Sequence, residues 1–388
     1  MKTSIFPQFS PQEYARRYQN IRHMMERKGV QALVIYGNSG MGRTAHSDIH
    51  YIANFLGNRD NFAVFPTSGE PALFAQSFNH VPDAQRASVL EDTQWGGPES
   101  AKKVAEYLSD LGVSQGEVGL VGGIPYHQYL ILTESLPEVH FRNLTGAFRL
   151  LRVDKSDEEV EWMRRGAAFT DAAVRSLVEG VEPGMKEYQL GPLLDRGYDM
   201  DGGQNVFHYI SSTSMYDSER CVPAQNQGER VIQKGDVILT EISIAYWGYA
   251  GQILRPISVA ADPTPDYEQL YRVAEDAYYQ VFEAIRPGVT AAEVLQAGAC
   301  IDETEFTIVD GLLHGFGIGL LPPSLRTPAT QEKPPQDFVF RPNQCIVIQP
   351  NIVTKDYQKG VQLGNLCLVT ESGLEPLQKF PVGFARAG

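Results

Sequence analysis

A carboxylate and a histidine, each in an apolar stretch, are the residues of this sequence best suited to move protons. Glu241 lies in the run VILTEIS after Val237 and Leu239, where a carboxylate is costly to bury unless it has a partner. His314 follows Leu313 and precedes the glycine-rich run GFGIG, which lets a ligand approach the backbone. Together they could act as general base and general acid. The alternatives are a structural ion pair at Glu241 and an ordinary buried histidine at position 314.

Two glutamines also interrupt apolar strand patterns. Gln252 lies in AGQILRP and Gln349 in CIVIQP. Because an amide both donates and accepts hydrogen bonds, the pair predicts a hydrogen-bonding shelf for a polar, neutral part of a substrate. Replacement of other polar groups by amides that only preserve the packing is the alternative.

The segment GGQNVFHYISSTS supplies further candidates for the same pocket. His208 could be a second acid or base, and Tyr209 and Ser212 could line the pocket, whereas the alternative for His208 is a buried structural role. A serine nucleophile is not indicated, because the chain has no GxSxG elbow.

Two arginines are candidates for binding a substrate carboxylate. Arg59 lies in FLGNRDNF and Arg326 follows the glycine-rich run. The guanidinium group matches a carboxylate with two parallel hydrogen bonds, so we expect either residue to hold a carboxylate-bearing substrate. A surface position or a structural ion pair is the alternative for each.

The elements that must position these residues form two regions. In the first, Ser10 and Glu13 predict the start of a helix that runs to about Lys28, and helices and strands alternate from there on. The strands are expected at 32–37, 61–66, 71–76 and 118–122, with a helix at 101–112. This alternation predicts an α/β domain over residues 1–150.

The second region begins near residue 151 and has a different pattern. Ser156 with Glu159, and Thr290 with Glu293, predict two capped helices, and a further long helix is expected at 267–285. Strand pairs at 231–260 and 345–373 surround them. Residues 151–388 are therefore predicted to form an α+β domain whose sheet is mostly antiparallel.

Composition limits the classes of partner. The 388 residues carry a formal net charge of -14, which disfavours nucleic acid and anionic membrane surfaces. The four cysteines form no CxxC pair, and neither an apolar signal core nor a run of eighteen apolar residues occurs. We therefore expect a cytoplasmic protein that binds a small-molecule substrate, no nucleic acid and no membrane.

Six segments in a fixed order resemble the creatinase and aminopeptidase P family of pita-bread hydrolases. They are HYIANFLG, LRVDKSDEEVEWMR, IQKGDVILTEISIAYWGYAGQILRP, LLHGFGIG, FRPNQCIVIQPNIV and GVQLGNLCLVTESG. The resemblance implies an α/β creatinase-like N-terminal domain (1–150), an α+β pita-bread catalytic domain (151–388) and a homodimer. It also implies that Arg59 follows a segment that reaches the partner's active site in creatinase-like dimers.

The resemblance fails at the metal-binding positions. Family members that use metal hold two divalent ions with two aspartates, one histidine and two glutamates, because anionic oxygens must neutralise the two cations. Here the aspartate positions are Glu241 and Gln252, the histidine is His314, and the glutamate positions are Gln349 and Gly364. We therefore expect no two-ion site and no cofactor. A single ion held by Glu241 and His314 would need further ligands.

The residues of this sequence also differ from those of creatinase itself, a family member that works without metal. Its catalytic histidine is expected at Ala224, and its guanidinium-binding glutamates are expected at Leu254 and Gln349. The main interpretation is a metal-independent, creatinase-like hydrolase that cleaves a C–N bond of a small polar, carboxylate-bearing substrate. The alternatives are a lyase using the same pocket, a metallopeptidase of the Xaa-Pro aminopeptidase type with a degraded metal site, and a non-catalytic binding protein.

Overall fold

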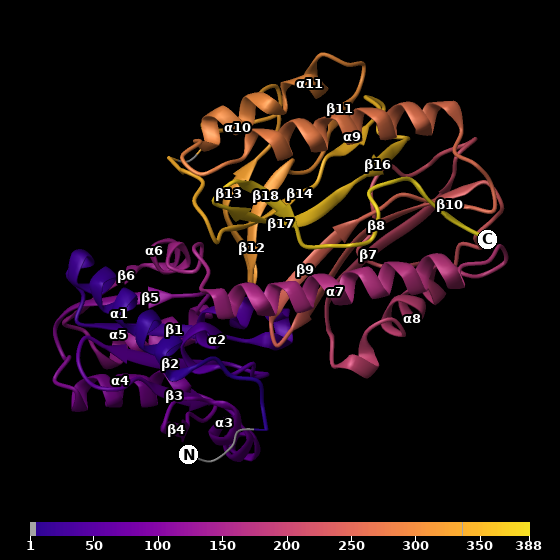
Figure 1. The fold of residues 1–388 in the computed structure, drawn as a ribbon. Helices are drawn as coiled ribbons and strands as arrows, with labels where there is room; N and C mark the ends of the chain where they lie inside the picture. The colour runs from indigo at the N-terminus through magenta and orange to yellow at the C-terminus, as the bar shows by residue number, and fades with distance from the viewer. Residues whose placement is uncertain (1–4, 336) are drawn as a thin grey trace. The chain divides into compact units, whose positions relative to one another are not determined.

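The computed structural model describes residues 5–335 and 337–388, and the chain divides into two compact units between Arg152 and Val153 (Figure 1). This division lies close to the boundary near residue 150 expected from the sequence.

The N-terminal unit contains one mixed sheet. Within its described residues the strand order is β4-β3-β2-β1-β5-β6; β2 runs antiparallel to β1 and β3, and β5 runs parallel to β1. The strands are β1 (Ala32–Gly37), β2 (Asn61–Pro66), β3 (Ala72–Ala75), β4 (Asp92–Trp95), β5 (Gly116–Val121) and β6 (Val139–Asn143). The helices are α1 (Pro11–Lys28), α2 (Ser47–Ala53), α3 (Val81–Ala87), α4 (Ser100–Asp110), α5 (Tyr126–Ser135) and α6 (Thr145–Leu150), with short 3-10 turns η1 (Ser39–Met41), η2 (Arg43–His46) and η3 (Phe78–His80).

The predicted first helix is confirmed at both ends. The Ser10 side chain accepts a hydrogen bond from the backbone N–H of Glu13, and Gly29 ends the helix at a φ of 65°. The Glu13 carboxylate also pairs with Arg16 and Arg17. Arg17 is fully buried and also donates to the carbonyl of Tyr51 at 2.9 Å, so this pairing joins α1 to α2.

The C-terminal unit is built around a larger, mostly antiparallel sheet. In the described residues its main path is β13-β12-β14-β17-β9-β8-β10-β19, with β18 beside β17 and β7 beside β8, and a small second sheet has the order β11-β15-β16. The helices are α7 (Asp157–Gly180), α8 (Leu190–Asp195), α9 (Pro265–Ala284), α10 (Ala291–Ala297) and α11 (Ala299–Asp302), with turns η4 (Glu187–Gln189) and η5 (Asp199–Asp201). The strands are β7 (Gln204–Ser214), β8 (Asp236–Tyr246), β9 (Tyr249–Leu254), β10 (Ile257–Val259), β11 (Thr307–Ile308), β12 (Leu313–Gly317), β13 (Gly319–Leu325), β14 (Cys345–Ile348), β15 (Asn351–Val353), β16 (Gly360–Gln362), β17 (Gly364–Thr370), β18 (Gly373–Pro376) and β19 (Ala385–Ala387).

Two hydrophobic cores lie on opposite faces of this sheet, under α7 and α9 (Figure 1). Strand β8 serves both, because successive side chains of a strand alternate between faces. Ile242 packs in the core with α7, whereas Leu239 packs in the core with α9. Glu241 therefore lies on the same face of β8 as Leu239. The predicted α/β and antiparallel α+β patterns of the two regions are both confirmed.

Glycines allow α7 to lie directly against β9. A Cβ atom on Gly166 would lie 2.6 Å from the backbone nitrogen of Gly251, and one on Gly251 would lie 2.5 Å from backbone atoms of Gly166. At the start of α7, Ser156 and Glu159 form the predicted capping box. The position of β9, which carries Gln252, is thus fixed by direct backbone contact with a capped helix.

A fully buried arginine joins β9 to the neighbouring strand β17. The Arg255 guanidinium donates to the carbonyl of Gly364, 2.8 Å away, and to Asn365 Oδ1, also 2.8 Å away. Further donations reach the carbonyls of Pro381 and Phe380 near the C-terminus. Burial lowers the pKa of Arg255 to about 10, which leaves it charged at neutral pH. Arg255 therefore has a structural position at the end of the hairpin.

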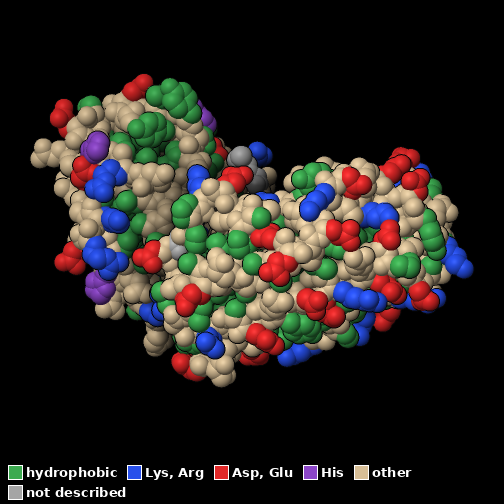
Figure 2. Space-filling model, turned by 90° about the horizontal axis from the view of Figure 1, so that it is seen from above, with side chains coloured by type: hydrophobic (Ala, Val, Ile, Leu, Met, Phe, Trp, Pro, Cys, Tyr) green, Lys and Arg blue, Asp and Glu red, His purple; other side chains and the backbone are tan. Residues whose placement is uncertain are grey.

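Acidic and basic side chains are interspersed on the face shown in Figure 2. Within the described residues, no helix is long and apolar enough to cross a membrane.

Candidate active site

The β8–β9 hairpin places Glu241 and Gln252 next to each other. Its tight turn has Trp247 at a φ of 45° and Gly248 at a φ of 88°, the positive values that a two-residue hairpin turn of type I′ requires. In the resulting register Gln252 pairs with Ser243, two residues along β8 from Glu241 and on the same face. Gln252 is 1% exposed, whereas Glu241 is only partly buried. Glu241 is therefore the more accessible of the two.

His314 and Gln349 come from two other strands of the same sheet. β12 and β14 are antiparallel neighbours, with His314 opposite Val347 and with Gln349 directly after β14. A register shift between His314 and Gly315 bends β12 at the histidine. The strand order thus brings a histidine and an amide from distant parts of the sequence toward the hairpin.

The four side chains form a continuous hydrogen-bonded row, which we call the amide row: Glu241, Gln252, Gln349 and His314. Gln252 Nε2 donates to Glu241 Oε1 at 3.0 Å and to Gln349 Oε1 at 2.8 Å. His314 Nε2 lies 3.2 Å from the same Gln349 Oε1. An acid and an imidazole are therefore linked through two amides, and the four residues singled out by the sequence lie together.

The row fixes the orientation of both amides. Both hydrogens of Gln252 Nε2 are directed at oxygen acceptors, and Gln349 Nε2 faces the Gly311 carbonyl at 3.4 Å. Rotating either amide by half a turn would set oxygen against oxygen. Gln252 Oε1 must then point away from the row, and it is buried with no hydrogen-bond partner among the described residues. A buried acceptor of this kind costs free energy until a donor reaches it.

Protonation at the two ends of the row is shifted toward the neutral forms. Burial raises the pKa of Glu241 to about 7, and the charge of Asp310 adds to this rise. Burial lowers the pKa of His314, opposed by its hydrogen bonds to the Gly315 carbonyl and to Gln349. The two nitrogens of His314 face the Gly315 carbonyl oxygen and Gln349 Oε1, and only a protonated imidazole could donate to both. Because its pKa is about 7, Glu241 can gain or lose a proton near neutral pH.

Asp310 is a member of this site that the sequence reasoning missed. Its Oδ2 lies 3.5 Å from Gln349 Nε2, and its side chain is exposed. The buried Asn351 holds its loop, because Asn351 Oδ1 accepts from the backbone N–H groups of Val309 and Asp310. The available signal was an Asp-Gly turn just before the histidine strand. It could not be weighed without knowing that Asn351 pairs with this turn.

The candidates Tyr209 and His208 on β7 lie on opposite faces of the sheet. Tyr209 is the cross-strand partner of Glu241, so its side chain lies on the same face, where its ring stacks on Phe207. His208 lies on the opposite face, bonded to Tyr198 and 3.6 Å from an Asp195 oxygen. Burial lowers the pKa of His208, and Asp195 opposes this effect. The structure therefore brings Tyr209, but not His208, to the amide row.

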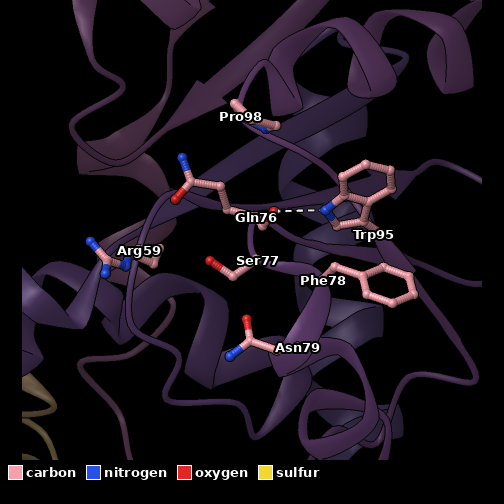
Figure 3. Close-up of a pocket in the computed structure, with 7 residues that line it drawn as sticks. All are labelled: Arg59, Gln76, Ser77, Phe78, Asn79, Trp95 and Pro98. Atoms are coloured by element: carbon pink, nitrogen blue, oxygen red, sulfur yellow. Dashed lines mark hydrogen bonds between the residues drawn. The ribbon is translucent and has the colours of Figure 1, made fainter.

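Within the described residues, neither Ser212 nor Arg326 is hydrogen bonded to the amide row. Ser212 is fully buried, donates to Glu187 Oε1 at 2.9 Å and accepts from Arg230 at 3.0 Å. Arg326 follows β13, and its Nε is buried without a hydrogen-bond partner in the described part of the chain. Arg59 belongs to the N-terminal unit, where it lines a pocket of about 450 Å³, the Arg59 pocket, together with Gln76, Ser77, Phe78, Asn79, Trp95 and Pro98 (Figure 3).

The donor set of the amide row does not fit the two-ion group that the family resemblance implies. Gln252 and Gln349 supply neutral oxygens, which neutralise no cation charge. At Gly364 a Cβ atom would lie 2.4 Å from the Ile348 carbonyl oxygen and 3.0 Å from the Cα of Gln349, so the site has no space for a side chain there. Among the described residues, no group of three or more His, Cys, Asp and Glu side chains could hold a metal ion.

Comparison with known proteins assigns the architecture. Residues 17–153 match the creatinase/prolidase N-terminal domain, and residues 161–371, more than half of the chain, match metallopeptidase family M24. The expected architecture, a creatinase-like N-terminal domain followed by a pita-bread domain, is confirmed. The chain belongs to metallopeptidase family M24.

Its relatives are named as peptidases. The Xaa-Pro dipeptidase of Pyrococcus horikoshii is 22% identical over 94% of this chain and 97% of its own length. The probable dipeptidase PepE of Mycobacterium tuberculosis is 26% identical over 82% of this chain and 83% of its own. The solved structure of the Xaa-Pro dipeptidase from Bacillus anthracis has a TM-score of 0.79 at 21% identity, covering 96% of this chain and 99% of that one. The last similarity shows the fold alone.

These findings correct the functional interpretation of the sequence. A metal-independent, creatinase-like hydrolase was the main expectation, and it is contradicted by membership of a metallopeptidase family whose similar members are named as dipeptidases. The findings support an enzyme of the hydrolase class and favour the peptidase alternative, and they give no support to a lyase. Homodimer formation and the small-molecule substrate stay predictions.

Proposed function

We propose that this protein is a peptidase that hydrolyses the amide bond of a small, dipeptide-sized substrate at the amide row. Family membership and the dipeptidase names of its relatives support the reaction class. The observation that carries the proposal is the carboxyl group of Glu241. It has a pKa of about 7 and stands at the accessible end of an otherwise buried polar row.

Glu241 serves as the group that moves the proton. In its ionised form it accepts a proton from the attacking water, whose oxygen bonds to the substrate carbonyl carbon. The protonated carboxyl then gives that proton to the nitrogen of the leaving amine as the C–N bond breaks. A pKa near 7 suits both steps, because the group exchanges protons readily in either direction at neutral pH.

The rest of the row positions Glu241 and receives the substrate. Gln252 holds one carboxylate oxygen by its 3.0 Å hydrogen bond, leaving the second oxygen to face water. Its unpaired Oε1 is a ready acceptor for an N–H group of the substrate. His314 acts through Gln349, to which it is hydrogen bonded, and is therefore a positioning residue in this proposal.

A peptidase assay on purified protein tests the proposal. Dipeptides with proline second, matched dipeptides with alanine second, and the acetylated forms are incubated with the protein, and the released amino acid is quantified. Turnover of a dipeptide, abolished in Glu241→Gln and kept in the matched exposed variant Glu371→Gln, is the expected result. Failure of the whole panel, with the protein folded, contradicts the peptidase proposal.

The same samples test the disagreement between the family and the donor set. Metal content is measured by elemental analysis, and activity is measured with a chelator and with added manganese, zinc or cobalt. Activity that is lost with chelator and restored by one ion would show that this altered donor set still holds metal. Unchanged activity in metal-depleted protein would assign the proton transfers to the side chains alone.

A further inference from the structure

Strand β17 changes its neighbour in the sheet next to the amide row. Residues 364–365 pair with β9, whereas residues 367–370 pair with β18. The next residue on each strand, Gln252 of β9 and Leu366 of β17, therefore lies where the two strands part. Both residues are buried, so the Gln252 carbonyl and the Leu366 N–H need hydrogen-bond partners from another part of the chain.

The side chain of Gln378 supplies both partners. Its Oε1 accepts from the backbone N–H of Leu366 at 2.9 Å, and its Nε2 donates to the carbonyl oxygen of Gln252 at 3.0 Å. One carboxamide thus makes the two hydrogen bonds that a neighbouring strand would make. Gln378 is 4% exposed, and its Nε2 also donates to Thr170 Oγ1 on α7 at 3.2 Å. The Gln378 amide is therefore held by β9, β17 and α7 together.

The backbone that follows Gln378 is fixed by contacts of its own. The buried Asp171 carboxylate on α7 accepts from the backbone N–H groups of Lys379 at 2.6 Å and Phe380 at 2.9 Å. The Arg255 guanidinium donates to the Phe380 carbonyl at 3.0 Å. This C-terminal segment therefore stays attached to the sheet and to α7 without the hydrogen bonds of the Gln378 side chain.

Gln252, whose backbone Gln378 holds, is the central member of the amide row. Its Nε2 donates to Glu241 Oε1 on β8 and to Gln349 Oε1 after β14, and in the sheet β14 is separated from β9 by β17. Hydrogen bonds weaken steeply as their distance and angle depart from the preferred values. A displacement of β9 at Gln252 would therefore weaken the contact with Glu241 and the contact with Gln349.

We propose that Gln378 is a positioning residue of the amide row. It holds the backbone of Gln252 at the point where β9 and β17 part, and this keeps the Gln252 side chain in contact with Glu241 and Gln349. Gln378 acts through Gln252 and takes no part in proton transfer itself. Its effect on turnover rests on the proposed peptidase function, whereas its effect on the geometry of the row does not.

Titration of the Glu241 carboxyl group by NMR tests the proposal without requiring turnover. The full-length protein is isotope-labelled at the side-chain carboxyl carbons of glutamate, and the Glu241 signal is assigned by its loss in Glu241→Gln. Gln378→Met keeps the size of the side chain and removes its hydrogen bonds. We expect Glu241 to titrate about 0.5–1 pH unit higher in this variant, because a weakened hydrogen bond from Gln252 stabilises the carboxylate less. Gln252→Met should shift the titration in the same direction, and the double variant should shift it no further than Gln252→Met does.

Asp171→Asn is the matched control. It weakens the hold on the same C-terminal segment at Lys379 and Phe380, so it should lower the melting temperature and leave the Glu241 titration in place. Gln378→Asn is a second variant, whose amide is one methylene too short to reach both strands, and it should shift the titration in the same direction as Gln378→Met.

Thermal melts establish that each variant is folded. A Glu241 titration that is unchanged in folded Gln378→Met or Gln378→Asn, or an equal shift in Asp171→Asn, would overturn the proposal. A shifted titration in a protein that cleaves no dipeptide would confirm the positioning role and contradict only the peptidase function. If dipeptides are cleaved, the acid limb of the kcat profile should move to higher pH together with the NMR titration.

Discussion

The amide row and the Arg59 pocket use similar polar residues in opposite ways. In the amide row Gln252, Gln349 and His314 are buried, and among their described atoms Gln252 Oε1 is the one side-chain atom left without a hydrogen bond. In the pocket, Arg59 is exposed and unpaired within the described chain, and the aromatic rings beside it face solvent. The first site is organised before a substrate arrives, whereas the second presents groups that a ligand would organise.

This difference predicts which measured property a substitution in each region should change. Buried, mutually paired groups shift pKa values and raise the free-energy cost of any change, so substitutions in the amide row should alter turnover, stability and pH dependence. The exposed groups of the pocket have few partners within the described part of the protein, so substitutions there should alter ligand affinity.

Glu241→Gln should have the largest effect. The substitution keeps the shape and removes the group that accepts and returns the proton, so we expect kcat to fall by about 10²–10⁴-fold while the melting temperature does not fall. Steady-state kinetics on the best dipeptide and a thermal melt measure the two quantities. Glu371→Gln is the control, with kinetics close to those of the unchanged protein. A Glu241→Gln enzyme with more than a tenth of normal kcat would exclude Glu241 as the proton-transfer group.

Gly364→Ala should destabilise the C-terminal unit. The new methyl group would lie 2.4 Å from the Ile348 carbonyl oxygen, against backbone rather than against a flexible side chain. Overpacking of this kind costs about 1–3 kcal/mol, and the short distance to backbone oxygen places this case toward the upper end. Urea denaturation measures it. Gly383→Ala, where a Cβ atom meets nothing within 4 Å, is the matched control. Equal stability of the two variants would contradict the close packing of the row.

Stability and activity should change in opposite directions between about pH 4.5 and 7. The pKa of Glu241 is raised in the folded state, so over this window the folded protein keeps a proton that the unfolded chain has lost. The free energy of unfolding should therefore fall as pH rises, by about 2–3 kcal/mol, while activity rises as the carboxylate forms. Urea midpoints and kcat/KM across the range measure both.

Glu241→Gln isolates this contribution, because His314, whose pKa is lowered by burial, acts in the opposite sense at the acid end. The difference in unfolding free energy between the variant and the unchanged protein should grow with pH and level off above about 7. A difference that stays constant with pH would show that the pKa of Glu241 is not raised.

The sequence could predict the parts of this protein that local patterns determine. Helix caps such as Ser156 with Glu159, and the alternation of strands in each region, depend on residues close in the chain. Glu241, Gln252, His314 and Gln349 could be grouped because each is a polar residue in an apolar strand, a pattern costly enough to need a reason. Their actual pairing still required the strand order of the folded sheet.

Register and loop contacts could not be predicted in the same way. The distinction between Tyr209 and His208 depends on which residue of β7 pairs with Glu241, and a register shift between Asn205 and Phe207 precedes both. Asp310 reaches the row only because Asn351, about forty residues later in the chain, holds its loop. Such contacts arise between distant segments and leave no periodic signal in the sequence.

His208→Ala should have the smallest effect, and it tests whether the face of β7 decides function. The side chain is as polar as His314, but it contacts Tyr198 and Asp195 on the face opposite Glu241. Loss of these partly buried contacts should lower the free energy of unfolding by about 0.5–1 kcal/mol. kcat should stay within about twofold of normal, since a group behind the sheet cannot exchange a proton with the substrate without a relay. Kinetics and urea denaturation of His208→Ala beside His314→Ala give the comparison. A larger loss of kcat in His208→Ala than in His314→Ala would mean that the catalytic face of this sheet is the one covered by α7.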